Sequence, residues 1–169
     1  MKKIIIVGCP GSGKTTFAEK LKNKIGVPLF YLDAVWHKPD EMHIAREEYS
    51  AHLPEILALD AWIIEGNYTR TLEGRIAACD TVFLFDLPID VCLDGAVSRL
   101  GRGRYDVPWL ESEPDPRFLK EIEEFPRKNL PAIYALIDKY RDGRRIEIFR
   151  SREQADEFIR RMCDFKEKP

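Results

Sequence analysis

The sequence predicts an α/β fold with three layers, in which a five-stranded parallel β-sheet lies between two layers of helices. Short runs of β-branched and aromatic residues alternate along the chain with longer stretches of helical periodicity, which is the pattern of a parallel sheet covered on both faces. A chain of 169 residues is also long enough to bury the core of one such domain without disulfides or metals. We therefore expect a single domain over residues 1–169.

Short apolar or aromatic runs are the expected strands, and they lie at residues 3–7, 29–32, 62–64, 81–85 and 146–149. The expected helices lie at residues 14–25, 46–59, 89–100, 118–128, 131–140 and 153–162. In the first helix Phe17, Leu21 and Ile25 recur at a spacing of four residues, and Gly26 then supplies a C-terminal stop. Pro54 is expected to kink or restart the second helix.

The segment 101–116, GRGRYDVPWLESEPDP, differs from the rest of the chain. Its glycines and prolines exclude long regular elements, whereas its arginines and acidic residues suit a mobile polar loop. We predict that this segment forms a lid.

The charge balance and the cysteines exclude several classes of function. The net charge is −2, and acidic and basic residues are interspersed, so a broad basic surface for nucleic acid is not indicated. Cys9, Cys79, Cys92 and Cys163 form no Cys-x-x-Cys pair, and we expect free thiols of a cytoplasmic protein rather than a disulfide framework or a zinc site.

The N-terminal segment imitates a signal peptide only in part. Lys2 and Lys3 precede an apolar run, but the run extends only from Ile4 to Val7, whereas the apolar region of a signal peptide needs about 7 to 15 residues. No other apolar run approaches the length of a membrane span. We expect no contact with a membrane.

The stretch GCPGSGKT, residues 8–15, carries the strongest functional signal in the chain. It matches every fixed position of the phosphate-loop (P-loop) pattern G-x-x-x-x-G-K-[ST], between an expected strand and an expected helix. Glycines let the backbone turn its N–H groups toward a polyphosphate, and the helix adds its positive N-terminal end. Lys14 would bridge the β- and γ-phosphates, while the Thr15 hydroxyl would hold Mg²⁺. The predicted nucleotide-binding residues of this loop are Gly8, Pro10, Gly11, Ser12, Gly13, Lys14, Thr15 and Thr16.

The form G-x-P-G-x-G-K-T, with Pro10, resembles the loop of adenylate-kinase-like small-molecule kinases. WIIEGNY (62–68) looks like a strand end of nucleoside monophosphate kinases, and CDTVFLFDLPIDVCLDGAVSRLGRGR (79–104) looks like their fourth strand, next helix and arginine-bearing lid entrance. With YLDAVW (31–36) and IFRSREQADEFI (148–159), nearly the whole chain resembles the topology modulation (FlaR-related) proteins of that superfamily. The resemblance implies a P-loop NTPase fold like that of nucleoside monophosphate kinases, with ATP and Mg²⁺ as cofactors and an unsettled acceptor.

Two acidic residues follow expected strands. Glu65 would place its carboxylate at the carboxyl edge of the sheet, where it would bind Mg²⁺ through water near Thr15; the alternative is a cap on a neighbouring helix. Asp33 could orient or deprotonate an acceptor hydroxyl, with a plain turn residue as the alternative. We assign acceptor binding to residues 33–60.

Arginines gather at the mouth of the predicted lid. Closure could bring Arg99, Arg102 and Arg104 onto the transferring phosphoryl group, although a solvated charged face is the alternative.

Three further arginines are predicted to contact the acceptor or ATP. Arg70 and Arg75 could bind acceptor anions, unless one of them only pairs with Glu73. By the resemblance, Arg152 lies in the last strand-to-helix loop, near the adenine of ATP.

The leading hypothesis is a Mg-ATP-dependent phosphotransferase, monomeric or homodimeric, that acts on a small-molecule or nucleotide acceptor. Its predicted catalytic residues are Lys14, Arg99, Arg102, Arg104 and Asp33. The alternative is an ATP-switched regulatory protein that modulates DNA topology, for which salt-sensitive DNA binding would be expected. The near-neutral net charge argues against that alternative.

Overall fold

The sheet is built around β1 (Lys3–Gly8), whose residues Ile4 to Val7 are wholly buried. In the computed structural model, which describes residues 1–32, 46–103 and 112–164, the strand order is β2-β3-β1-β4-β5 and every pairing is parallel. The inner neighbours of β1 are β3 (Trp62–Glu65) and β4 (Thr81–Phe85), and the edge strands are β2 (Leu29–Tyr31) and β5 (Arg145–Phe149). Because both faces of the sheet are covered, β1 is a continuous apolar run rather than an alternating one. The predicted five-stranded parallel α/β fold is confirmed.

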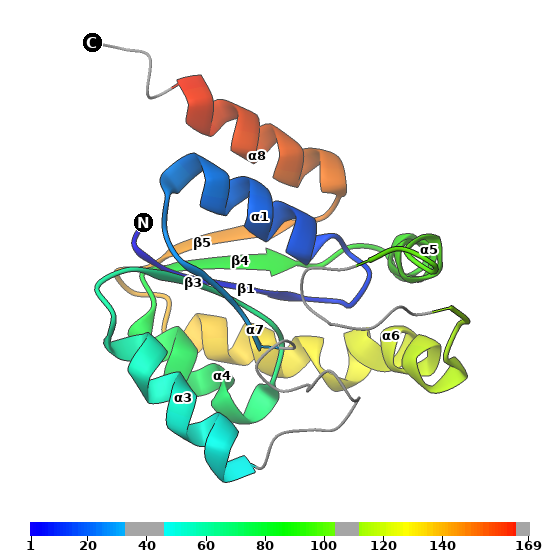
Figure 1. Cartoon of the computed structure of the whole chain (residues 1–169), viewed down its shortest axis with the longest axis horizontal. Helices are drawn as coiled ribbons and strands as arrows, with labels where there is room; N and C mark the ends of the chain where they lie inside the picture. Colours follow the sequence, from blue (N-terminus) through cyan, green and yellow to red (C-terminus); the bar gives the residue numbers. More distant parts are fainter. Residues whose placement is uncertain (33–45, 104–111, 165–169) are drawn as a thin grey trace.

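Helices cover the sheet on both faces. Figure 1 shows α1 (Lys14–Ile25) and α8 (Arg152–Asp164) on one face, and α3 (Arg46–Ala58), α4 (Thr69–Ala78) and α7 (Leu130–Lys139) on the other. Within the described residues, no helix combines the length and the apolar character that crossing a bilayer requires.

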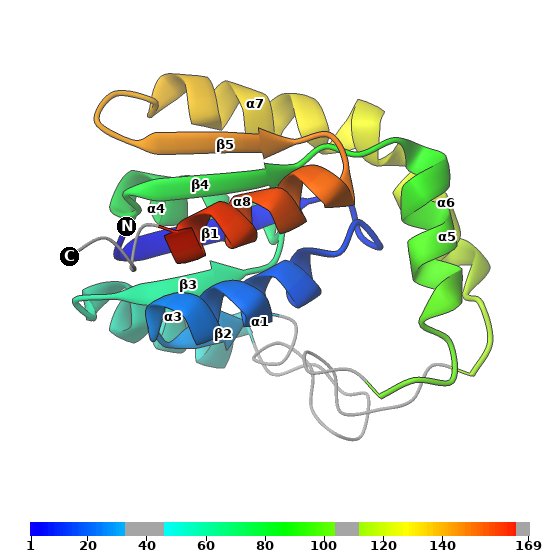
Figure 2. The ribbon, with the colours of Figure 1, turned by 90° about the horizontal axis from the view of Figure 1, so that it is seen from above.

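Two further helices lie beyond the carboxyl ends of the strands. Figure 2 shows α5 (Ile89–Ser98) and α6 (Pro116–Lys128) side by side at this edge, and the two helices pack against each other. In parallel α/β sheets, ligands bind at the carboxyl edge of the strands. This pair of helices therefore forms one wall of the region where a site is expected.

A cluster of aromatic rings anchors α1 to the sheet. The Phe17 ring packs edge-on against the rings of Phe83 and Phe85 on β4, with centroids 5.0 and 5.3 Å apart, and against Phe149 on β5 at 5.3 Å. Phe158 on α8 joins the same cluster, 5.0 Å from Phe83. Edge-to-face pairs of this kind stabilise a core beyond the apolar area that they bury. They hold the first turns of α1 in place immediately after the loop that begins at Gly8.

Among the described residues, the helix α4 was missed by the sequence interpretation. Its segment TRTLEGRIAA contains a glycine, and the side chains that it buries are Leu72, Arg75 and Ile76. A buried arginine interrupts the apolar periodicity that identifies a helix from sequence, because its burial depends on contacts that only the folded chain supplies. Pro54 neither ends nor restarts α3, which runs through it from Arg46 to Ala58.

Candidate active site

The loop between β1 and α1 is a tight cradle of glycines. Gly8, Gly11 and Gly13 have φ angles of 137°, 78° and 101°, a region that other residues rarely adopt. Space is also short, because a Cβ at Gly8 would lie 2.2 Å from the carbonyl oxygen of Phe85, and one at Gly11 would lie 2.0 Å from that of Cys92. The loop thus has the backbone conformation that exposes N–H groups to an anion.

Lys14 is buried at the base of this loop, and its Nζ atom donates a hydrogen bond to the carbonyl oxygen of Cys9 at 3.0 Å. The same carbonyl accepts hydrogen bonds from Ser12 Oγ at 2.6 Å and Ser12 N at 3.3 Å. A hydrogen bond to the Cys92 thiol, together with burial, raises the pKa of the Cys9 thiol, so Cys9 is neutral and not a nucleophile near pH 7. The charge of the loop therefore comes from Lys14.

Glu65 and Thr15 meet across the end of the sheet. Glu65 is the last residue of β3 and is paired in register with Ile6 of β1, so its side chain lies beside the loop that follows β1. Glu65 is 4% exposed, and its Oε2 atom accepts a hydrogen bond of 3.2 Å from Thr15 Oγ1. The Glu65 carboxylate thus reaches the Thr15 hydroxyl, as predicted from the sequence.

These two oxygens fit a Mg²⁺ ion that takes its other ligands elsewhere. Hydroxyl and carboxylate oxygens are ligands that Mg²⁺ accepts, and the ion usually keeps phosphate oxygens and waters as well. Among the described residues, no group of three or more His, Cys, Asp or Glu side chains could enclose a metal by itself. Metal binding by Thr15 and Glu65 stays a prediction.

Arg152, the first residue of α8, holds the loop from its carbonyl side. Its Nη2 atom donates to the carbonyl oxygens of Gly11 at 2.9 Å and of Val91 at 3.0 Å, and its Nε atom donates to that of Ser12 at 3.4 Å. In a trans peptide the carbonyl and the N–H point in opposite directions, so this contact turns the Gly13 N–H away from Arg152. Contact between Arg152 and a nucleotide stays a prediction.

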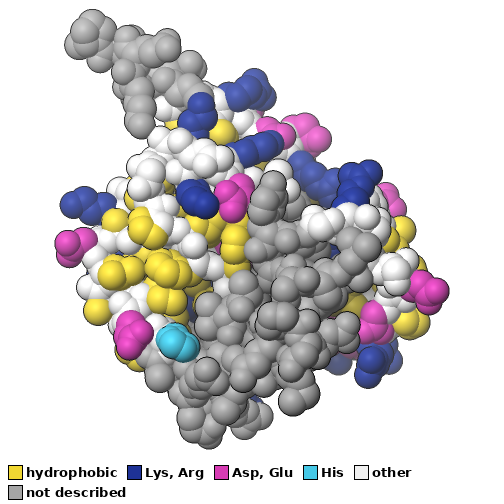
Figure 3. Space-filling view, in the orientation of Figure 1, with side chains coloured by type: hydrophobic (Ala, Val, Ile, Leu, Met, Phe, Trp, Pro, Cys, Tyr) yellow, Lys and Arg dark blue, Asp and Glu magenta, His cyan; other side chains and the backbone are white. Residues whose placement is uncertain are grey.

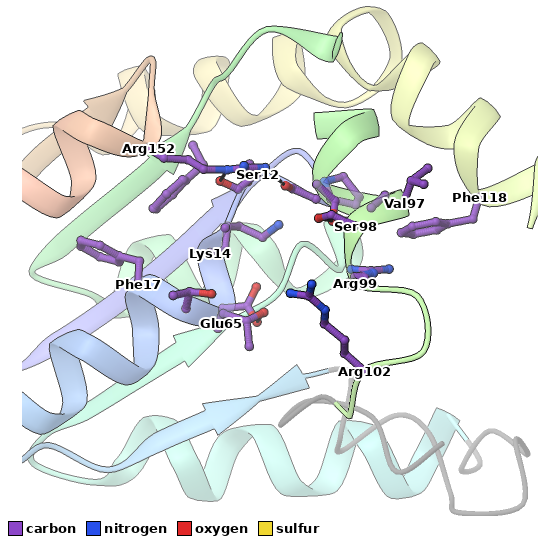
Figure 4. Close-up of a pocket in the computed structure, with 18 of the residues that line it drawn as sticks. Ser12, Lys14, Phe17, Glu65, Val97, Ser98, Arg99, Arg102, Phe118 and Arg152 are labelled. Carbon is purple, nitrogen blue, oxygen red and sulfur yellow. Dashed lines mark hydrogen bonds between the residues drawn. The ribbon is translucent and has the colours of Figure 1, made fainter. Parts of the chain in front are cut away.

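Arg99 and Arg102 reach the same region from the C-terminal end of α5. The Arg99 guanidinium lies 5.0 Å from the centre of the Phe118 ring on α6, a cation–π contact. In Figure 4 the Arg102 side chain points from the segment after α5 toward Lys14 and Glu65. The two other predicted catalytic residues, Asp33 and Arg104, lie outside the described residues.

The described side chains and loop residues of this region line one cleft of about 930 Å³ between the P-loop, the end of β3, α5 and α6: Gly11, Ser12, Gly13, Lys14, Thr15, Glu65, Arg99, Arg102 and Arg152. Pro10 and Thr16 line it as well, and acidic side chains of Glu113, Asp115 and Glu121 lie on its α6 side. Its volume is at the upper end of the range for small-molecule sites, enough for a nucleotide and a second small molecule. The glycine cradle and the lysine fit a triphosphate with Mg²⁺ bound.

Gly95 on α5 is a site residue that the sequence interpretation missed. A Cβ at Gly95 would lie 2.1 Å from the carbonyl oxygen of Gly11 and 2.2 Å from Nη2 of Arg152. Only a glycine therefore lets α5 approach the P-loop this closely. The available signal was a single glycine inside the otherwise regular helical stretch IDVCLDGAVS.

The sequence interpretation also did not identify Asn67 as a residue of the site. Its side-chain amide makes two hydrogen bonds with the backbone of Gly8, from Gly8 N to Oδ1 at 3.0 Å and from Nδ2 to Gly8 O at 2.9 Å. Nothing in the pattern of a single sequence marks an asparagine after a strand as the partner of a loop 59 residues earlier.

Arg75 does not bind acceptor anions, and that prediction was wrong. The residue is 0% exposed, and it donates to the backbone carbonyls of Gly66, Asn67 and Tyr68. Nor do the hydrogen bonds of Glu73 involve it, since this carboxylate accepts from Lys139 and Tyr140.

Comparison with known proteins shows a shared fold. No family model and no curated protein matches the sequence. A shikimate kinase from Bacteroides thetaiotaomicron matches the structure over 98% of both chains, with a TM-score of 0.57 and 16% identity. A shikimate kinase from Acinetobacter baumannii, in complex with shikimate, matches over 99% of this chain and 96% of its own, with a TM-score of 0.61 and 14% identity. The predicted P-loop fold of the nucleoside monophosphate kinase type is confirmed.

Proposed function

We propose that this chain, which shares the fold of the P-loop kinases, is a Mg-ATP-dependent phosphotransferase with a small-molecule acceptor. The observation that supports it best is the convergence of Lys14, the Thr15–Glu65 pair and Arg102 on one cleft. A cation from the P-loop, a metal-binding oxygen pair and an arginine from the lid entrance are the groups that phosphoryl transfer requires.

Each group has a distinct role in the proposed reaction. The Lys14 ammonium and the N-terminal end of α1 would hold the β- and γ-phosphates, and bound Mg²⁺ would neutralise part of the phosphate charge. Arg99 and Arg102 would compensate the charge that develops as the γ-phosphorus leaves the bridging oxygen and bonds to the acceptor oxygen. The acceptor proton would pass to Asp33. Closure of residues 101–116 over the cleft would exclude water, which would otherwise hydrolyse ATP.

The acceptor region is proposed to be residues 33–60, and the shikimate kinase neighbours favour a small hydroxylated acceptor. Membership of the topology modulation proteins is a narrower proposal, which rests on the quoted sequence segments. Among the described residues, the basic side chains on the face drawn in Figure 3 are interspersed with acidic ones, which favours a small acceptor over DNA.

The experiment that tests this proposal is an acceptor panel. Mg-ATP consumption by the purified protein is measured with nucleoside monophosphates, nucleosides, small polyols and hydroxy acids, and with DNA as one member. We expect one small acceptor to raise turnover well above the rate without acceptor. If only DNA changes the hydrolysis rate, the ATP-switched regulator takes the place of the kinase.

Replacing Glu65 with glutamine is expected to raise the Mg²⁺ concentration needed for half-maximal turnover about tenfold. The substitution keeps the shape of the side chain but removes the charge that lies 3.2 Å from Thr15 Oγ1. Titrating Mg²⁺ at saturating ATP measures the effect. Glu123→Gln, on the exposed face of α6, is the matched control and should leave the Mg²⁺ dependence unchanged. An unchanged midpoint in Glu65→Gln would remove Glu65 from the metal site.

A further inference from the structure

The P-loop begins at a residue whose strand neighbour on one side is missing. On the side of β4, Gly8 is paired with Phe85, and Cys9 N donates to Phe85 O at 3.2 Å. On the side of β3, the ladder ends earlier, with Ile6 opposite Glu65 and Gly66 N donating to Ile6 O at 3.2 Å. Alternate residues of a strand direct their N–H and C=O groups to the same side, so those of Gly8 face the space beyond the end of β3.

The Asn67 side chain fills this space. Its amide accepts from Gly8 N at 3.0 Å and donates to Gly8 O at 2.9 Å, so one side chain reproduces the two hydrogen bonds of a strand neighbour. Such a two-point contact fixes the orientation of the Gly8 peptide groups as well as their position. Gly8 is the residue at which the chain turns from the strand into the phosphate cradle, with a φ angle of 137°.

The backbone of Asn67 is itself held by Arg75. The Nη1 atom of Arg75 donates to Gly66 O at 2.8 Å, and Nη2 donates to Asn67 O at 2.9 Å and to Tyr68 O at 3.0 Å. Nε donates to Thr71 Oγ1 at 3.2 Å. A planar guanidinium that donates to three consecutive carbonyls restrains the turn between β3 and α4.

We infer that Arg75 and Asn67 together act as a brace, in which the buried arginine fixes the turn and the asparagine then positions the start of the P-loop. Both members are positioning residues: Arg75 is wholly buried and acts through Asn67, and Asn67 acts through Gly8. The importance of the Arg75–Asn67 brace for nucleotide binding rests on the proposed function.

Asn67→Ala is the first test. The variant lacks both bonds to Gly8, while Asn67 is only half-buried, so the fold should survive. We expect hydrogen exchange of the Gly8 amide, measured without nucleotide, to accelerate about tenfold or more, and the Kd for Mg-ATP to rise by about the same factor. Asn23→Ala, at an exposed position of α1, should change neither quantity.

The second test, Arg75→Lys, distinguishes an arginine that positions the P-loop from one that only stabilises the fold. An ammonium group cannot serve three carbonyls in a fixed plane, so the turn should loosen although the charge is kept. We expect a lower Tm, faster exchange of the Gly8 amide and weaker Mg-ATP binding. Arg160→Lys, on the exposed surface of α8, is the control.

The double variant decides whether the two residues act in series. If Arg75 acts through Asn67, adding Arg75→Lys to Asn67→Ala should weaken Mg-ATP binding no further, whereas independent effects would multiply. The brace is overturned if Asn67→Ala retains the exchange rate of the Gly8 amide, or if the effects of the two substitutions on Kd multiply. If the unaltered protein binds no Mg-ATP, the proposed function fails, and the exchange measurement alone decides on the brace.

Discussion

Replacing Lys14 with methionine is expected to lower phosphoryl transfer by about 100- to 1000-fold, the loss typical of removing one preorganised group that stabilises developing charge. The Lys14 ammonium is the charged group of the P-loop, held at its base by the carbonyl oxygen of Cys9. Methionine has a similar length and a good helix propensity, so the first turn of α1 should persist. Turnover with the acceptor found in the panel measures the effect.

The fold should tolerate this substitution, because no buried acceptor loses its last donor. The carbonyl oxygen of Cys9 keeps its hydrogen bonds from Ser12 Oγ and Ser12 N. The Tm should therefore change little. Lys22→Met, on the exposed face of the same helix, is the matched control and should retain full activity. Full activity in Lys14→Met would refute its assigned role.

Two glycine-to-alanine substitutions in helices are expected to have opposite effects on stability. Alanine is favoured over glycine in a helix interior by about 1 kcal/mol, and Gly74 on α4 has open space where a Cβ would lie, so Gly74→Ala should stabilise the protein. In Gly95→Ala the added Cβ would lie 2.1 Å from the carbonyl oxygen of Gly11, which is backbone and cannot swing aside. We expect Gly95→Ala to lower the free energy of unfolding by about 1–3 kcal/mol.

Gly95→Ala should also weaken nucleotide binding, because the displaced groups belong to the P-loop. The same Cβ would lie 2.2 Å from Nη2 of Arg152, which donates to Gly11 O and Val91 O. Denaturant unfolding and Mg-ATP affinity of the two variants, measured side by side, test the prediction. If Gly95→Ala is as stable as Gly74→Ala and binds Mg-ATP equally well, α5 does not control the loop.

The secondary structure of the described residues follows largely from local patterns, but α4 does not. Phe17 and Leu21 identify α1 by their spacing, and Ile4 to Val7 identify β1 by their apolar run, since both patterns are properties of short segments. The helix α4 was not predicted from the sequence because Arg75 occupies one of its buried positions. That burial is stable only because three carbonyls of the turn just before α4 accept its hydrogen bonds.

Several residues of the candidate site could likewise be predicted from local patterns or from a general rule of parallel sheets. Gly8, Gly13, Lys14 and Thr15 are contiguous and have fixed spacing, so the phosphate loop could be predicted from eight residues alone. Glu65 was placed near Thr15 by a rule of parallel sheets, and the two side chains do meet.

The amino-acid sequence by itself therefore determined the α/β class, the P-loop and the edge of the sheet at which chemistry would take place, because each depends on local spacing or on a general property of parallel sheets. Only the tertiary structure decided the roles of Asn67, Arg75 and Gly95. Asn67 meets Gly8 across 59 positions of the chain, and Gly95 packs on Gly11 through the docking of a whole helix. Such contacts depend on how distant segments pack, and no local pattern of residues encodes them.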